Sequence, residues 1–134
     1  MKQLKAIFDY NVIACFISSS FRERILYELS SPQKRLRALD RFSHNADSII
    51  NSDCIYYKGK SIPDTVKYEI KKSASECIAL SFEHQQGKQM LIDEAFDYLT
   101  YESTVVIVVI SDWLIIKPEY ERGAGLFYVL RKKR

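Results

Sequence analysis

The chain has 134 residues, the usual size of one folding domain, and its 47% hydrophobic and 28% charged composition excludes an intrinsically disordered protein. The longest apolar run, Val105 to Ile110, is far shorter than the roughly 20 residues of a membrane helix, which excludes a spanning segment of that kind. We therefore expect one domain over residues 1–134 and no membrane partner.

Charge is unevenly distributed, although the formal net charge is only +3. Residues 1–60 hold ten Lys or Arg against six Asp or Glu, residues 61–130 hold six against eleven, and residues 131–134 are all basic. The pattern permits a positive surface for an anionic partner, or attraction between the two halves within one fold. We rank the second interpretation somewhat ahead of the first.

The N-terminal half, residues 1–60, is predicted to be mainly helical and basic. Residues 4–17 are rich in β-branched and aromatic types and predict one or two strands, broken near Asp9 to Asn11. Ser20, with Glu23 three residues later, has capping-box spacing and predicts a helix of about three turns. A second helix is predicted from Pro32 to about Ile50, because its apolar residues recur at helical spacing: Leu36, Leu39, Phe42, Ala46 and Ile49 or Ile50.

The C-terminal half, residues 61–134, is predicted to join an acidic helix to β-strands. Just before this half, residues 54–57 predict a short strand. The pattern of residues 63–74 fits either a strand or a helix, and we favour a helix. Residues 77–82 predict a strand, residues 85–88 a polar loop, and residues 90–101 a helix. The exposed face of this last helix carries Asp93, Glu94 and Asp97.

Three β-rich runs close the chain, at residues 104–110, 113–117 and 126–131. They predict an antiparallel three-stranded meander, and the uniformly apolar run at residues 105–110 predicts a central strand covered on both faces. The predicted fold class is therefore α+β: an antiparallel sheet with a C-terminal three-stranded meander, covered by three or four helices.

The basic face of the second predicted helix is the leading candidate site. At 100° per residue, Lys34, Arg37, Arg41 and His44 lie opposite the apolar stripe, where their cationic groups can contact successive phosphates of a nucleic acid. The alternative is a solvated or intramolecularly paired surface. Stacking platforms would support binding, and the nearby aromatic residues not assigned to the core are Tyr27, Tyr56 and Tyr57.

Catalytic and metal-binding residues are not indicated. His44 and His84 lie outside any H-x-x-x-H unit, and Cys15, Cys54 and Cys77 lack C-x-x-C spacing, so we predict no metal, no cofactor and no catalytic residue. The odd number of cysteines, in runs that favour burial, is typical of free thiols in a reducing compartment, and we expect a cytoplasmic location.

Three functions follow in order of preference. The first is a non-enzymatic binding protein whose basic helix face, with the tail Arg131 to Arg134, meets an anionic partner, preferably nucleic acid. The second is a protein-interaction module of the inhibitor, immunity or assembly-factor type, which uses the acidic helix and edge strands. The third, a small hydrolase or nuclease, requires a histidine beside a carboxylate in a cleft.

Overall fold

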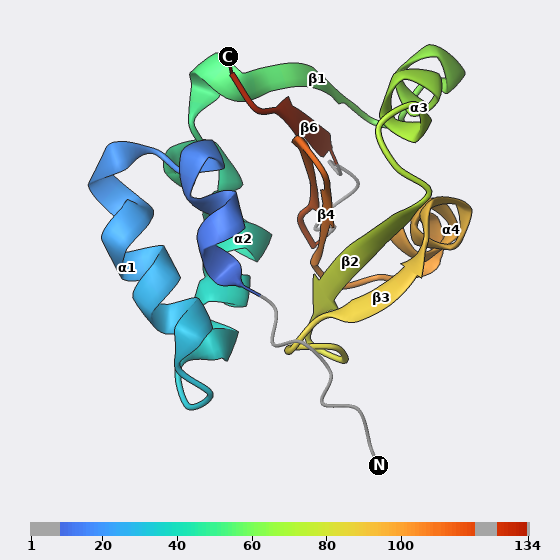
Figure 1. Ribbon diagram of the computed structural model, residues 1–134. Coiled ribbons are helices and arrows are strands. Elements are labelled where there is room, and N and C mark those ends of the chain that lie inside the picture. The colour runs from blue at the N-terminus through green and yellow to red at the C-terminus, as the bar shows by residue number, and fades with distance from the viewer. Residues whose placement is uncertain (1–8, 120–125, 134) are drawn as a thin grey trace.

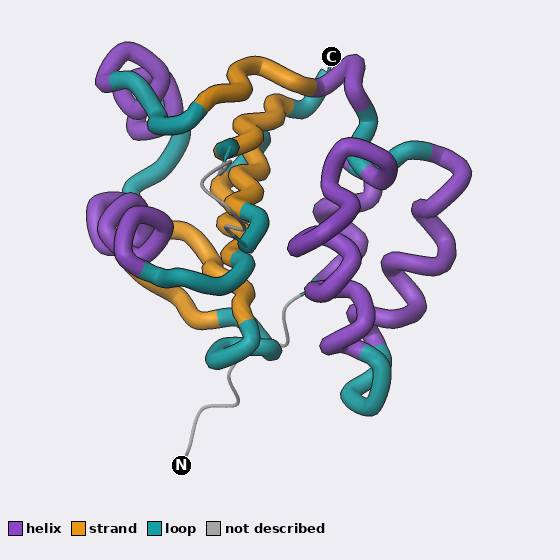
Figure 2. The backbone as a smooth tube through the Cα atoms, turned by 180° about the vertical axis from the view of Figure 1, so that it is seen from behind, coloured by secondary structure: helices purple, strands orange, loops and turns teal. Residues whose placement is uncertain are grey.

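The computed structural model describes residues 9–119 and 126–133, and these form an open six-stranded antiparallel sheet with helices on both faces (Figures 1 and 2). Its strand order is β1-β6-β5-β4-β2-β3. The strands are β1 Ile55–Gly59, β2 Glu76–Ser81, β3 Lys88–Leu91, β4 Val106–Ile110, β5 Trp113–Lys117 and β6 Phe127–Arg131. The predicted α+β class is confirmed, and the predicted C-terminal meander, β4-β5-β6, forms the middle of the sheet.

The meander strands are covered on both faces, as the uniformly apolar run predicted. Every residue of β4 and β5 is buried, and successive residues belong to different cores because side chains alternate across a strand. On β4, Ile107 points into the first core and Val108 into the second; on β5, Ile116 and Ile115 divide in the same way. The sheet therefore separates two apolar cores.

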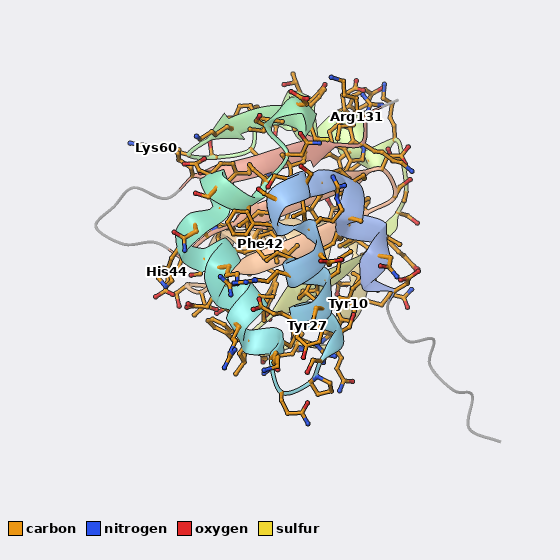
Figure 3. All side chains as sticks on the ribbon, turned by 90° about the vertical axis from the view of Figure 1, so that its left-hand side faces the viewer. Tyr10, Tyr27, Phe42, His44, Lys60 and Arg131 are labelled. Atoms are coloured by element: carbon orange, nitrogen blue, oxygen red, sulfur yellow. The ribbon has the colours of Figure 1, made fainter. Side chains whose placement is uncertain are left out.

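The first core lies under the N-terminal helices (Figure 1). These are the 3-10 helix η1 (Tyr10–Phe16) and the helices α1 (Ser19–Ser30) and α2 (Arg35–Ile49), followed by the short 3-10 turn η2 (Ser52–Cys54). Phe42 is fully buried in this layer (Figure 3), and Ile25 and Leu39 are fully buried members of the same core.

The second core lies under α3 (Asp64–Lys71) and α4 (Ile92–Tyr101), on the opposite face of the sheet (Figures 1 and 2). Trp113 is fully buried here; its indole N–H donates to Ser73 Oγ at 2.8 Å, and its ring meets Tyr56 edge-on at 4.9 Å. The guanidinium of Arg131 lies 4.7 Å from the indole centroid.

Two sequence predictions are corrected. The prediction of strands within residues 4–17 is wrong where the structure describes them, because residues 10–16 form η1. Ile13 and Phe16 are buried there at the i, i+3 spacing of a 3-10 helix. Residues 4–8 lie outside the described residues. Lys88, predicted to end a polar loop, instead begins the edge strand β3. That strand escaped prediction because its side chains are mostly exposed and lack apolar alternation.

Helix starts also differ from the predictions. Residues 32–34 form a turn and α2 begins at Arg35, since the Ser31 hydroxyl donates to Gln33 instead of capping a helix. The first helix begins after Ser18, so Ser20 lies inside it. The favoured helix for residues 63–74 is confirmed as α3. No helix in residues 9–119 or 126–133 combines the length and apolar character required to cross a bilayer.

Candidate nucleic-acid interface

The outer surface of α1 and α2 contains a hollow of about 690 Å³ lined by basic side chains. Three of the predicted site residues come together here: Lys34 in the turn before α2, and Arg37 and Arg41 on α2. The helix α1 adds Arg24 and Tyr27, with Glu23 and Glu28. Tyr27 lies on the outer side of the helical layer (Figure 3).

Helical spacing accounts for this convergence. Residues 34, 37 and 41 follow i, i+3, i+7, and residues 24, 27 and 28 follow i, i+3, i+4, so each set occupies one side of its helix. The opposite sides carry Ile25 and Leu29 on α1 and Leu39 on α2, all fully buried. Burial of these apolar faces against the sheet turns both polar faces toward the same solvent-filled hollow.

Arg41 is held within the molecule by a carboxylate. Its Nε and one terminal nitrogen donate to the two Glu28 carboxylate oxygens, each at 2.9 Å. The Glu28 side chain is only 5% exposed, whereas that of Arg41 is 30% exposed. The hydrogen bonds from Arg41 lower the pKa of Glu28 against the opposing effect of burial. Arg41 therefore neutralises a buried carboxylate, and the exposed cations of the hollow are Arg24 and Arg37, with Lys34 half-buried.

This ion pair predicts a stability loss in acid. Because the pKa of Glu28 is lowered in the folded protein, the pair contributes its full stability above the ordinary glutamate pKa of 4.5 and loses it as pH falls through the lower folded value. Urea denaturation between pH 7 and pH 3 should show this decline, and Glu28→Gln should make it shallower. An unchanged slope in the variant would contradict a role for this carboxylate.

Tyr27 is an exposed aromatic residue in the middle of these cations. It is 60% exposed and lines the hollow together with Arg24 and Arg37. The sequence had left Tyr27 outside the core, and its position supplies the stacking surface that many single-strand binding proteins place between basic residues. Arg24 was not predicted from the sequence, because it lies on α1 and the periodicity of the second helix carries no information about it.

His44 lies apart from this hollow, toward the opposite margin of the helical layer (Figure 3). Its Nε2 is 3.5 Å from Asp40 Oδ1, and it lines a different hollow with Asp47 and Tyr128. The Tyr128 hydroxyl donates to Asp47 Oδ1 at 2.7 Å, which lowers the pKa of that carboxyl. The structure thus brings together Lys34, Arg37 and Arg41 but not His44.

Other basic residues of the N-terminal half have structural contacts. Arg22 donates to the carbonyls of Ala14 and Ile17, each at 2.9 Å, and joins η1 to α1. Arg35 is buried and donates to the Leu29 carbonyl at 2.7 Å. The excess of positive charge in residues 1–60 therefore reflects, in part, arginines that hold backbone carbonyls.

An apolar hollow of about 610 Å³ adjoins the basic one and shares Arg37 with it. Leu36 and Phe82 line it, with Asp40 and Gln85. Leu36 had been assigned to the apolar stripe of the second helix, but 48% of it is exposed. Helical periodicity could not separate it from the core, because its side chain lies at the margin of the stripe.

Residues of the acidic helix α4 and of the basic tail form contacts within the molecule. On α4, Asp93 lies 2.7 Å from Lys71 Nζ and Glu94 accepts from the Leu91 backbone N–H at 2.9 Å. The tail residue Arg131 stacks on Trp113, at the opposite end of the molecule from Tyr27 (Figure 3). Arg134 lies outside the described residues. The free sheet edges belong to β1 and β3.

Hydroxyl, carboxylate and imidazole side chains, which are common in catalytic sites, gather near the end of β2. The Tyr98 hydroxyl contacts Ser81 Oγ at 2.8 Å and Glu83 Oε1 at 3.3 Å, and the His84 ring lies 5.9 Å from that of Tyr98. His84 Nε2 is 3.7 Å from the adjacent Glu83, beyond normal hydrogen-bond distance.

Burial raises the pKa of the Cys77 thiol to about 12, which disfavours a reactive thiolate. Within the described residues, no group of three or more His, Cys, Asp or Glu could hold a metal ion.

Comparison with known proteins found no match at any of three levels. No family model matches the sequence, and neither a curated protein nor a solved structure is significantly similar to it.

Proposed function

We propose that this protein binds single-stranded nucleic acid in the basic hollow between α1 and α2. The observation that carries the proposal is the position of the exposed Tyr27 ring among Arg24, Lys34 and Arg37. Cations attract the phosphate backbone, and an aromatic face stacks on an unpaired base of any sequence. A duplex offers its phosphates but no free base face, so the arrangement favours a single strand.

The expected binding is weak and depends on salt. Contacts from Arg24, Lys34 and Arg37 to three phosphates would give a slope of about −2 for log K against log salt, because each single-strand contact contributes about −0.7. Fluorescence anisotropy of labelled 12-nucleotide single strands and matched duplexes, measured over a salt series, tests this. The single strand should bind more tightly than the duplex.

Charge reversal at Arg24 and Arg37 provides the decisive variant. Arg24→Glu with Arg37→Glu should lower the salt slope by about 1.4 and abolish measurable affinity at moderate salt. A control with the same charge change, Lys72→Glu with Lys88→Glu, alters one exposed residue directly after α3 and one on β3, away from the hollow. Equal losses in both double variants would refute the hollow as the binding site, as would no binding by the unmodified protein at low salt.

Stacking is tested separately by Tyr27→Ala, which leaves every charge in place. The variant should lose about tenfold in affinity at an unchanged salt slope, because base stacking on an aromatic ring contributes about 1–3 kcal/mol. Tyr27→Phe keeps the ring and should retain most of the affinity. A Phe variant as weak as the Ala variant would exclude stacking as the role of Tyr27.

The second candidate function is recognition of a protein partner, and the apolar hollow favours it. Leu36 and Phe82 lie next to the cations, a combination that suits an acidic amphipathic helix. A synthetic helix with Leu on one face and Glu on the other is the probe. Under this alternative the peptide binds the protein, Leu36→Asp abolishes that binding, and single-stranded nucleic acid does not compete.

A further inference from the structure

A smaller hollow is lined by residues of α3, α4 and β6 on the other face of the sheet. Figure 1 shows these two helices on that face. The hollow has a volume of about 190 Å³, and its floor is formed by Phe96, Leu99 and Phe127, each no more than 6% exposed. The two covering helices are only eight and ten residues long. The two helices do not cover the start of β6 completely, and the space left between them and β6 is the hollow.

Two lysines from different elements stand at this hollow. Lys60 comes from the loop after β1 and Lys67 from α3, and among the described residues neither forms an ion pair. The Lys67 ammonium lies 5.2 Å from the centroid of the Phe96 ring. Their neighbours differ in this respect: three nearby lysines are each paired with a carboxylate, namely Lys58 with Asp47, Lys71 with Asp93 and Lys72 with Glu69.

The loop that carries Lys60 is fixed in place. The Tyr57 hydroxyl donates to the Ser61 carbonyl at 2.7 Å, so the side chain of Tyr57 spans the turn. Gly59 permits this, because a Cβ at that position would lie 2.7 Å from Cζ of the Tyr57 ring. Lys60 therefore starts from an ordered backbone, which limits the entropy lost when its ammonium group contacts a ligand.

We propose that this hollow binds a small molecule that carries one anionic group on a compact apolar body. The apolar floor would take the body, and Lys60 and Lys67 would hold the carboxylate, sulfonate or phosphate at the mouth. The volume corresponds to about six water molecules at ~30 Å³ each, which suits a ring with one substituent and is smaller than a drug-sized pocket. The site is independent of the α1–α2 hollow.

Phenyl phosphate is the probe, with inorganic phosphate and phenol as its two halves. In ¹H–¹⁵N correlation spectra of the full chain, phenyl phosphate should shift the amides of Ser61, Lys67 and Thr100 to saturation, with a Kd of about 1 mM or lower. Each half alone should bind at least about tenfold more weakly. Equal affinity for phenol would contradict a role for the lysines in binding, and equal affinity for inorganic phosphate would contradict a role for the apolar floor.

Variants separate this pocket from general attraction to a basic surface. Lys60→Gln and Lys67→Gln should each weaken phenyl phosphate binding about tenfold. Lys72→Gln, at the residue directly after α3, should change it less than about twofold. Thr100→Phe should abolish binding without removing a charge, because the new ring fills the hollow. Binding that survives Thr100→Phe, or shifts centred on Arg24 and Arg37, would overturn the assignment.

Discussion

Replacement of Arg41 by Met is expected to lower the free energy of unfolding by about 3 kcal/mol. The variant leaves the Glu28 carboxylate, whose side chain is 5% exposed, without the two hydrogen bonds that compensate its burial. Loss of one partner from a buried ion pair costs about 3–5 kcal/mol, and the partial exposure of Arg41 places this pair at the lower end. Urea denaturation followed by circular dichroism measures the change.

The double variant Glu28→Leu, Arg41→Met serves as the control, because it removes both charges. It should recover most of the lost stability, since apolar residues of similar size often replace buried pairs at little cost. A double variant as unstable as Arg41→Met would show that packing, and not the orphaned carboxylate, explains the loss. Arg41→Glu is unsuitable for binding studies, because a second carboxylate beside the buried Glu28 should destabilise the packing of α1 on α2 and so imitate a loss of binding.

Replacement of Trp113 by Ala should lower the free energy of unfolding by about 4 kcal/mol, the usual range for a large aromatic residue removed from a core. Trp113 is fully buried and contacts Tyr56 on β1, Arg131 on β6 and Ser73 after α3. It therefore joins three parts of the fold. As the chain has one tryptophan, unfolding of the variant must be followed by circular dichroism.

Ser73→Ala is the matched control for this prediction. It removes the partner of the indole N–H but leaves the ring in place, so it should cost only about 1 kcal/mol. If Trp113→Ala were no more harmful than Ser73→Ala, the indole would contribute through its hydrogen bond alone and the packing interpretation would be wrong.

The sequence predicted the elements whose local pattern and tertiary surroundings agree. The meander was predictable because Val106 to Ile110 is apolar throughout, and a strand of that kind must be covered on both faces. The residues of η1 were misassigned because their composition resembles a strand, whereas the i, i+3 burial of Ile13 and Phe16 depends on the helices and strands that form the first core. The strand propensity of individual residues carries no information about these tertiary contacts.

The candidate site was predicted in part for a similar reason. Periodicity on one helix brought Lys34, Arg37 and Arg41 to one face, but it could not show that Arg41 is paired with a glutamate thirteen residues earlier. Nor could it reveal Arg24 and Tyr27, which join the hollow only because α1 packs beside α2. Contacts between elements decide which cations remain available to a ligand.

The pairing of β1 with β6 has a consequence for biosynthesis. Ile55 lies opposite Leu130 and Gly59 opposite Phe127, so the first strand joins the sheet through the last one. A ribosome must therefore have extended the chain to about residue 131 before β1 can find its neighbour. Until then the apolar faces of α1 and α2 lack the part of the sheet formed by β1 and β6, and the incomplete core must be protected or must close rapidly once β6 has been made.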